Sequence, residues 1–427
     1  MLKKFVVFFL LLFLVFNFAE YVFADEPDIS AEAAILIDAD TGRILYEKNI
    51  HKKMYPASTT KILTAIIAIE RGNLDEKITV DKETPYEIQG SHIALEPDEV
   101  LTMRDLIYAT LIESANDAAA VIGKTISGST EEFAKLMNSK AKEIGAKNTS
   151  FTNANGLHDD NHTTTAYDLA MIAKYAMQND LFKSIVSTYT YTIEPTNKKS
   201  VPRYLKSENK LLYGTEKINV DGNTVTVKYD GANGIKTGYT TQAQSCLVAS
   251  AEKNGQKLIS VVLKAKGNNV FIDTHKLLNY GFNNFSSVKL AFKNEFIDNI
   301  DVENGDKEMV TGIVASDVYG LVPKERVNDI KKNIILPEKI SAPITKGQVI
   351  GKIEILLDGK VIETANIVSA MEINQKPTFD VASMGSKGSL VKKWWVWLVL
   401  LMISWRIYVE FKRKKARRRR QSSYLYR

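Results

Sequence analysis

The stretch Tyr55-Pro56-Ala57-Ser58-Thr59-Thr60-Lys61-Ile62-Leu63-Thr64 decides the fold expected for this chain. A proline followed by small and hydroxyl residues and then by an apolar run predicts the start of a buried helix. Ser58 and Lys61 are three residues apart, so their side chains would be neighbours on that helix. A hydroxyl with an amine within reach is a nucleophile with a base, and the free N–H groups of a helix start favour an oxyanion beside it.

Two further motifs follow later in the chain. Ser114-Ala115-Asn116 lies on a short connection between two predicted helices, and Lys236-Thr237-Gly238 lies in a strand-like run over residues 234–240. The order Ser-x-x-Lys, Ser-x-Asn, Lys-Thr-Gly is typical of penicillin-binding proteins and serine β-lactamases. Each motif alone is common by chance, but three of them in this order indicate a serine acyl-transfer site.

The chain resembles the low-molecular-mass penicillin-binding proteins, the serine-type D-alanyl-D-alanine carboxypeptidases. The likeness extends over four stretches, which are residues 34–42, 113–118, 151–157 and 230–240. It implies an α/β (α+β) serine β-lactamase/transpeptidase-like catalytic domain with a central antiparallel sheet and a helical lobe, plus a small all-β C-terminal domain. The pattern along the chain agrees, because helices enclosed between an early hairpin at 33–47 and late strands predict one sheet whose first and last strands meet.

Each motif has a chemical role in this hypothesis. Ser58 would attack the carbonyl of a D-Ala-D-Ala peptide bond, and Lys61 would accept its proton if burial and the nearby charge of Lys236 keep the amine neutral. Lys236 and the Thr237 hydroxyl are suited to bind a terminal carboxylate. Gly238, which has no side chain, would let a substrate backbone approach the strand edge.

Other roles come from the resemblance alone. It implies that Ser114 relays a proton toward the leaving amine and that Asn116 offers its amide to the substrate or to Lys61. It also implies an oxyanion hole made by the backbone N–H groups of Ser58 and Tyr239, and covalent inhibition by β-lactam antibiotics.

The site is expected to need no cofactor and no metal. His158 and His162 are four residues apart, which invites a zinc interpretation. The stretch between them is rich in Asp and Asn and begins after Asn155-Gly156, so it is poor helix material. Loop structure at the rim of the cleft is the expected role of both histidines.

The start of the chain indicates export. Two lysines at 3 and 4 precede an apolar run over residues 5–18, and Ala24 fits a signal-peptidase site. A retained N-terminal anchor is the alternative. Cys246 is the only cysteine, which excludes a disulfide within the chain, and its apolar surroundings predict a buried, inert thiol.

The C-terminus carries the basic charge of the chain. Residues 412–420 hold eight basic residues, so the remaining 48 basic and 50 acidic residues give that remainder a net charge of −2. A basic run beside an apolar segment predicts membrane orientation and not nucleic-acid binding. The run from Trp394 to Trp405 is apolar on all faces. Counted to Phe411 with Arg406 snorkelling, the segment is about 27 Å long, slightly under the ~30 Å of a hydrocarbon core, so a short span is favoured over an in-plane helix.

These features define a predicted organisation and localisation. The expected parts are a signal peptide (1–24), a D,D-peptidase domain (25–285), a β-rich domain (286–384), a linker (385–393), a membrane anchor (394–411) and a basic cytoplasmic tail (412–427). The protein is expected at the cell membrane with its catalytic domain outside the cytoplasm.

The function hypothesis is an exported, membrane-anchored D-Ala-D-Ala carboxypeptidase acting on peptidoglycan stem peptides. A β-lactamase is one alternative, but no Glu-x-x-Leu-Asn stretch lies between Asn116 and Lys236 to supply the deacylating glutamate of class A enzymes. A catalytically silent peptidoglycan- or penicillin-binding membrane protein is the other. Whether endopeptidase action accompanies carboxypeptidase action is left open by the sequence.

Overall fold

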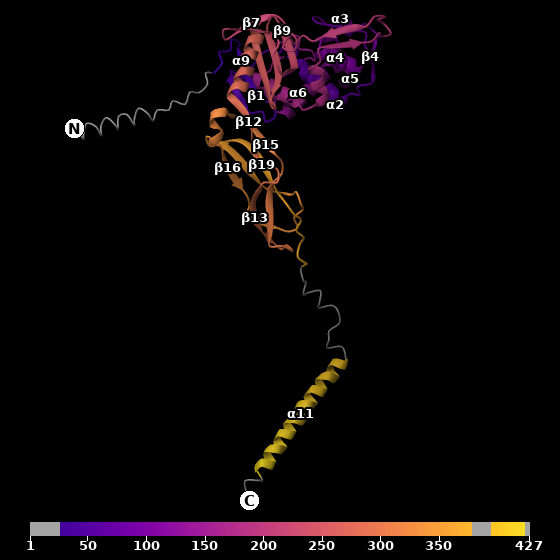
Figure 1. The fold of residues 1–427 in the computed structure, drawn as a ribbon. Helices are drawn as coiled ribbons and strands as arrows, with labels where there is room; N and C mark the ends of the chain where they lie inside the picture. The colour runs from indigo at the N-terminus through magenta and orange to yellow at the C-terminus, as the bar shows by residue number, and fades with distance from the viewer. Residues whose placement is uncertain (1–25, 378–393, 423–427) are drawn as a thin grey trace, which may run out of the picture. The chain divides into compact units, whose positions relative to one another are not determined.

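The computed structural model describes residues 26–377 and 394–422 (Figure 1). By its contacts the chain forms two compact units. The larger contains the residues up to Phe296 together with Ile313–Leu336 and Gly351–Ile367, and the smaller contains Ile297–Gly312, Pro337–Ile350 and the residues from Val368 onward. The predicted signal peptide and the predicted linker fall outside the described residues.

A five-stranded antiparallel sheet organises the larger unit. Its order is β2-β1-β11-β10-β9, and the strands are β1 (Ala33–Asp38), β2 (Ile44–Lys48), β9 (Ala232–Thr240), β10 (Gln244–Lys253) and β11 (Gln256–Ala265). The N-terminal strand pairs with the late strand β11, with Ile35 opposite Val261. The prediction that the first and last strands meet in one sheet is therefore confirmed, and β9, which carries the Lys-Thr-Gly motif, lies at one edge.

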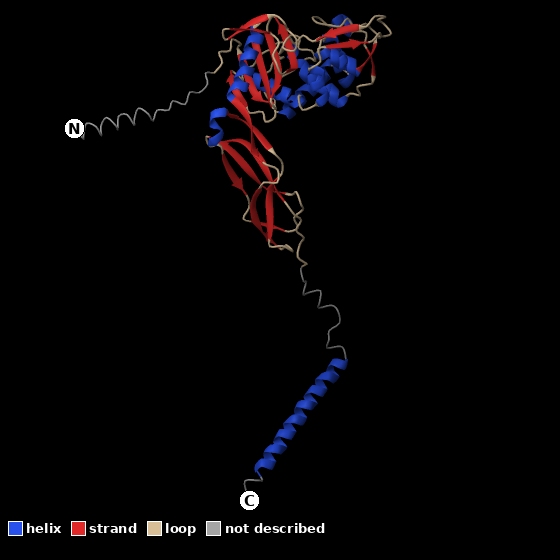
Figure 2. Cartoon of the chain, in the orientation of Figure 1, coloured by secondary structure: helices blue, strands red, loops and turns tan. Residues whose placement is uncertain are grey.

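Helices fill the chain between the early hairpin and the late strands (Figure 2). In chain order they are η1 (Ala57–Thr60), α2 (Lys61–Arg71), α3 (Thr84–Glu87), α4 (Met103–Leu111), α5 (Asn116–Ser127), α6 (Thr130–Ile144), α7 (Ala166–Ala176) and α8 (Asp180–Val186), and α9 (Asn269–Asn284) follows the sheet. Small two-stranded sheets lie among them, formed by β3 (Lys77–Thr79) with β4 (Val100–Thr102), β5 (Thr190–Ile193) with β6 (Arg203–Lys206), and β7 (Lys217–Val220) with β8 (Asn223–Thr226).

Alternate side chains of the sheet enter two different cores. On β1, Ile35 and Ile37 belong to the cluster that includes the apolar residues of α2, α4, α5 and α7. Ala34 and Leu36 belong to the second cluster, with Leu277 of α9. This is the two-residue period of a strand buried on both faces, and it places α2 on the side of the helical lobe.

Local signals in the sequence define several helix ends. Thr102 caps α4 in a reciprocal capping box with Asp105. Gly145 ends α6 in the left-handed conformation, with φ of 97°. The helix α8 begins after the capping residue Asn179, whose side chain accepts from the backbone N–H of Phe182.

The chain from Phe285 to Ser369 is almost entirely β-structure, as the sequence predicts. Its elements are β12 (Phe285–Ala291), β13 (Phe296–Glu303), β14 (Met309–Val314), β15 (Val318–Pro323), η2 (Lys324–Asp329), β16 (Lys331–Ile335), β17 (Lys339–Ser341), β18 (Val349–Leu357) and β19 (Lys360–Ser369). They form a two-stranded sheet β12-β15 and a six-stranded sheet β16-β18-β19-β14-β13-β17. Asp358 and Gly359, both with positive φ, make the tight turn between β18 and β19.

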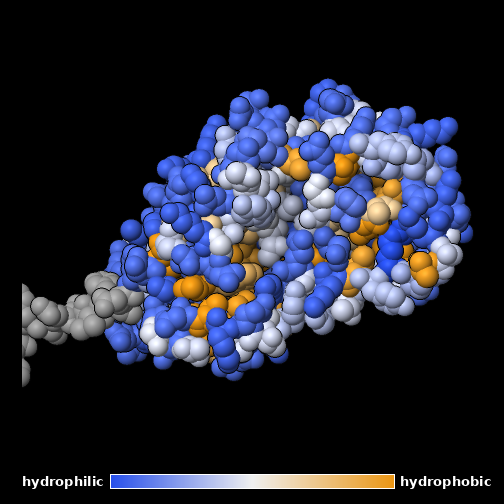
Figure 3. All heavy atoms as spheres, turned by 90° about the horizontal axis from the view of Figure 1, so that it is seen from above, coloured by the Kyte–Doolittle hydropathy of each residue, from blue (hydrophilic) through white to orange (hydrophobic). Residues whose placement is uncertain are grey.

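The apolar C-terminal segment is helical. α11 runs over Trp394–Ser422, and its part Trp394–Lys415 is long and apolar enough to cross a membrane, by length and composition only. The face of the molecule in Figure 3 is mainly hydrophilic, with hydrophobic residues in small separate groups.

Candidate active site

The predicted nucleophile lies in a tight turn that leads directly into α2. Ser58 is the second residue of η1, and Ala57 before it has φ of 49°, which is uncommon for a non-glycine residue. Two buried hydroxyls close the turn, because Thr59 Oγ1 donates to the Pro56 carbonyl at 2.7 Å and Thr60 Oγ1 donates to the Ala57 carbonyl at 2.9 Å. The turn that presents Ser58 is thus fixed by its own neighbours.

Lys61 Nζ contacts three oxygen atoms, one of which is the Ser58 hydroxyl. It lies 2.8 Å from Ser58 Oγ, 2.6 Å from Asn116 Oδ1 and 2.7 Å from the backbone carbonyl of Asn155. The amide oxygen and the carbonyl can only accept hydrogen bonds, whereas a hydroxyl can also donate. A neutral amine would therefore direct its two N–H groups at Asn116 and Asn155 and its lone pair at Ser58.

The surroundings favour this neutral form. The Lys61 side chain is completely buried. Burial, and then the positive charge of Lys236, hold the pKa of Lys61 well below its usual value. Burial also lowers the pKa of Lys236, although the carboxylate of Glu208 opposes that shift.

The amide of Asn116 is oriented by a backbone carbonyl on the opposite side. Its Nδ2 donates to the Gln89 carbonyl at 2.6 Å, which leaves Oδ1 facing Lys61. Asn116 is the first residue of α5, and its backbone N–H donates to the Ser91 carbonyl at 2.8 Å. Ser114, two residues earlier, is buried in a left-handed backbone conformation with φ of 60°. The Ser-x-Asn motif therefore lies on the helix–helix connection predicted for it, held against the loop that contains Gln89 and Ser91.

The loop containing Asn155 and Gly156 approaches the nucleophile turn closely. The Asn155 carbonyl accepts from Lys61, and Gly156 has φ of 84°. A Cβ at Gly156 would lie 1.9 Å from the Ala57 carbonyl oxygen and 3.0 Å from Ser58 N. Only glycine fits this position, since both neighbouring atoms belong to the backbone.

His162 supports the same turn from inside the protein. Its Nδ1 accepts from the backbone N–H of Thr152 at 3.0 Å, so the proton resides on Nε2, which lies 2.8 Å from Thr60 Oγ1. Burial lowers the pKa of His162 to about 4. Both ring nitrogens are thus engaged within the protein. The prediction of loop structure holds for this histidine, but it lies in the interior and not at a rim.

The edge strand β9 brings the third motif to the nucleophile. Lys236 is 1% exposed, and the space over Gly238 is filled by the nucleophile turn, because a Cβ there would lie 3.0 Å from Ser58 N and 3.1 Å from Thr59 N. The missing side chain of Gly238 thus serves the contact between β9 and η1. Tyr239, the next residue, is 69% exposed.

The side chain of Glu208 contacts the two polar side chains of the Lys-Thr-Gly motif on β9. Glu208 Oε2 accepts from Thr237 Oγ1 at 3.2 Å and lies 3.4 Å from Lys236 Nζ. Of the predicted site residues, Ser58, Lys61 and Asn116 are joined by direct hydrogen bonds, and Gly238 packs against the turn of Ser58. Lys236 and Thr237 meet at Glu208.

The sequence analysis assigned no role to three residues that the structure brings into the site. Asn155 and Gly156 belong to a stretch quoted for the resemblance and for its poor fit to a helix, and their Asn-Gly turn chemistry is the signal that could have singled them out. Glu208 has no such signal in the sequence.

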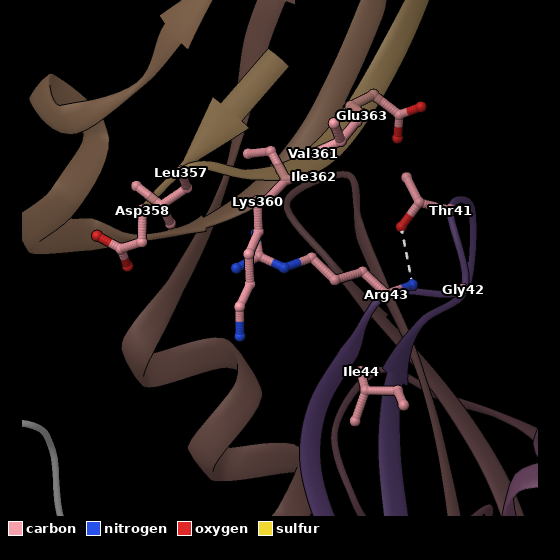
Figure 4. A pocket seen from close by; sticks show the side chains of 10 residues that line it. All are labelled: Thr41, Gly42, Arg43, Ile44, Leu357, Asp358, Lys360, Val361, Ile362 and Glu363. Carbon is pink, nitrogen blue, oxygen red and sulfur yellow. Dashed lines mark hydrogen bonds between the residues drawn. The ribbon is translucent and has the colours of Figure 1, made fainter. Parts of the chain in front are cut away.

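The described residues contain no group of three or more His, Cys, Asp or Glu that could hold a metal. A pocket of about 610 Å³ lies elsewhere in the larger unit, lined by residues 41–44 and by residues of the β18–β19 hairpin (Figure 4). The backbone N–H of Arg43 in its wall donates to Thr41 Oγ1 at 3.1 Å. None of its lining residues belongs to the three motifs.

Comparisons with known proteins find related sequences and structures. The family model of D-alanyl-D-alanine carboxypeptidase matches residues 21–267, and that of the penicillin-binding protein 5 C-terminal domain matches residues 285–375. The D-alanyl-D-alanine carboxypeptidase DacF of Bacillus subtilis is 35% identical over 355 residues, which are 81% of this chain and 86% of that protein.

Two further relatives extend the comparison. The D-alanyl-D-alanine carboxypeptidase DacC of Escherichia coli is 31% identical over 372 residues, covering 84% of this chain and 88% of that protein. The crystal structure of penicillin-binding protein 5 from Haemophilus influenzae superposes with a TM-score of 0.69 at 30% identity, covering 83% of this chain and all of that one. The resemblance inferred from the motifs is thereby confirmed, together with the fold class.

Proposed function

Because the chain belongs to the D-alanyl-D-alanine carboxypeptidase family, we propose that it removes the terminal D-alanine of peptidoglycan stem peptides through an acyl-enzyme on Ser58. The observation that carries the proposal is the contact of 2.8 Å between Lys61 Nζ and Ser58 Oγ. The two other neighbours of that amine can only accept hydrogen bonds, so a neutral Lys61 has its lone pair free for the serine proton.

The proposed reaction begins with proton transfer from Ser58 Oγ to Lys61 Nζ as the oxygen attacks the carbonyl carbon of the D-Ala-D-Ala bond. The backbone N–H groups of Ser58 and Tyr239 stabilise the negative charge that forms on the carbonyl oxygen. The C–N bond then breaks, and the leaving D-alanine takes a proton delivered through Ser114. Water hydrolyses the resulting ester and restores the serine.

Binding of the substrate involves the other motif residues in this proposal. Asn116 holds Lys61 through Oδ1, and Lys236 with Thr237 receives the terminal carboxylate. A β-lactam would acylate the same serine, because its strained amide takes the place of the D-Ala-D-Ala bond. The protein is therefore proposed to be a penicillin target.

Labelled penicillin tests the nucleophile directly. The wild-type protein is expected to become covalently tagged on the peptide containing Ser58, and Ser58→Ala is expected to remain untagged. Ser187→Ala, at an exposed serine, is the matched control and should be tagged normally. Tagging at another residue would contradict the proposed mechanism.

Two substrates separate the proposed enzyme from its alternatives. Release of D-alanine from diacetyl-L-Lys-D-Ala-D-Ala, lost in Ser58→Ala, supports the carboxypeptidase. Rapid nitrocefin turnover without cleavage of the peptide would instead indicate a β-lactamase. Tagging by penicillin without turnover of either substrate would indicate a silent binding protein.

Export and anchoring to the cell membrane are part of the proposal. The apolar part of α11, Trp394–Lys415, supports an anchor, and the basic residues beyond it favour a cytoplasmic tail. The full chain should fractionate with membranes, whereas a chain ending at Ser389 should not. Protease added to intact spheroplasts should digest the catalytic domain, and N-terminal sequencing of the mature protein should begin at Asp25. A soluble full-length chain, or protection from the protease, would contradict this arrangement.

A further inference from the structure

The groups expected to bind the substrate carboxylate already hold a carboxylate of the protein. A single oxygen of Glu208, Oε2, accepts a hydrogen bond from the Thr237 hydroxyl at 3.2 Å and lies 3.4 Å from the ammonium of Lys236. A terminal carboxylate needs the same two donors, so it and Glu208 compete for one place.

The charges around Lys236 and Thr237 affect a leaving group with a free carboxylate differently from one without it. Lys236 faces Glu208 directly, and the carboxylate of Glu113 also acts on its charge. Lys61 is the other lysine of the site, and it adds no charge in its neutral form. Among the described residues, the charged groups found to act on Lys236 are therefore two carboxylates, those of Glu208 and Glu113.

Other nearby cations are engaged elsewhere. The ammonium of Lys206 lies over the rings of Tyr189 and Tyr213, at 5.4 and 5.0 Å from their centroids. Lys210 pairs with Glu216. Neither lysine compensates the negative charge beside Lys236.

We propose that Glu208 is a specificity-determining residue that weakens the preference of the site for a free carboxylate on the leaving group. The inference rests on the proposed function of Ser58 and deepens it by naming a substrate class. A terminal carboxylate must displace Glu208 and meets a like charge while doing so. A leaving D-alanine whose carboxyl group is amidated, or continues into a further peptide bond, does not. Peptides extended beyond the second D-alanine therefore belong to the substrate range of this site.

Glu208 can act in this way because its side chain is free to move away from Lys236 and Thr237 when a substrate binds. Its side chain is 41% exposed, and its contact with Lys236 is long for a charged pair. It lies on the connection between β6 and β7, where a change of side-chain conformation would not disturb the sheet. A substrate can thus replace it on Thr237 at the cost of bringing two carboxylates close together.

The test compares two peptides, diacetyl-L-Lys-D-Ala-D-Ala and its C-terminal amide, by the ratio of their kcat/KM values. For the wild type we expect similar values for the acid and the amide. Glu208→Gln keeps the shape and removes the charge, so it should raise the acid-to-amide ratio about tenfold, mainly through a lower KM for the acid. Glu216→Gln, at a glutamate that also pairs with a lysine, is the matched control and should leave the ratio unchanged.

The outcomes separate this inference from the proposed function. An unchanged or lower ratio in Glu208→Gln would overturn the inference, and an equal loss of kcat on both peptides would show that Glu208 only positions Lys236. Labelled penicillin supplies the second measurement. If Ser58 is tagged in the wild type and in Glu208→Gln but the ratio does not move, the inference alone fails. If Ser58 is never tagged, the proposed function fails and the inference with it.

Discussion

Replacing Gly156 by alanine tests how strongly the nucleophile depends on the neighbouring loop. The added Cβ would lie 1.9 Å from the Ala57 carbonyl oxygen and 3.0 Å from Ser58 N. Both are backbone atoms, so no side-chain rotation relieves the overlap and the turn carrying Ser58 must move. Gly128 offers a matched control, because its φ of 81° is close to the 84° of Gly156 and a Cβ there meets nothing within 4 Å.

Both substitutions place alanine in an unfavourable backbone conformation, and only Gly156→Ala adds a steric overlap. Each forces alanine into the left-handed region, which costs about 1–2 kcal/mol. Gly156→Ala adds the overlap with the backbone, for which overpacking in a folded core suggests about 1–3 kcal/mol more. A displacement of the reacting group by about 1 Å lowers the rate of a positioned reaction about 100-fold. We therefore expect Gly156→Ala, unlike Gly128→Ala, to be acylated about 100-fold more slowly.

The assay is the second-order rate constant for acylation by a fluorescent penicillin, with thermal unfolding of both variants measured in parallel. Gly128→Ala should be destabilised but acylate at the wild-type rate. If Gly156→Ala also acylates at the wild-type rate, or if the two variants lose equal stability, the close approach between the loop and the nucleophile turn does not position Ser58.

Two further predictions concern the buried titratable groups. Lys61→Arg should be acylated at least 1,000-fold more slowly, because a guanidinium stays charged and has no lone pair for the Ser58 proton. This factor is roughly the scale of losing a catalytic base. Penicillin tagging of the folded variant measures the rate, and fast tagging would exclude Lys61 as the base. His162 has a folded-state pKa of about 4, below the ordinary 6.5, so the unfolded chain binds the extra proton between these values. The stability due to the neutral ring is complete above pH 6.5 and is lost as the pH falls toward 4, by about 3 kcal/mol. Urea unfolding from pH 7 to pH 4 should therefore show a shallower pH dependence in His162→Gln, and an unchanged slope would contradict the assignment.

The part of the site that the sequence predicts is the part that local spacing controls. Ser58 and Lys61 meet because they are three residues apart in a helical turn, and this holds although Ser58 lies in η1 and Lys61 begins α2. Asn116 is found at the start of a helix because the apolar pattern ends before it and resumes after it. The same reasoning gave the sheet, whose strands have a clear apolar pattern and whose order follows from the enclosed helices.

The rest depends on contacts between distant segments, for which the sequence contains no period or spacing. The carbonyls of Gln89 and Asn155 are backbone groups, so no side-chain type at either position identifies them as partners of Asn116 and Lys61. Glu208 reaches β9 from a loop 28 residues earlier. A lone glutamate in a polar loop is ordinarily solvent-exposed, and only the three-dimensional structure places it on the Lys-Thr-Gly motif.

The hydrogen bonds around Lys61 connect these distant contacts to the chemistry. Asn116 Oδ1 and the Asn155 carbonyl can only accept hydrogen bonds from the Lys61 amine, and they belong to two different segments of the chain. Together these two contacts fix the direction of the third position on Lys61 Nζ, which faces Ser58. When Lys61 is neutral, that direction holds a lone pair and the Ser58 hydroxyl donates to it. Once the proton has been transferred, the same direction holds an N–H group that can only donate. In the proposed reaction, the charge of Lys61 would therefore reverse the hydrogen bond to Ser58 while the nitrogen and oxygen atoms stay in place, and the two contacts would keep the base aligned through both halves of the reaction.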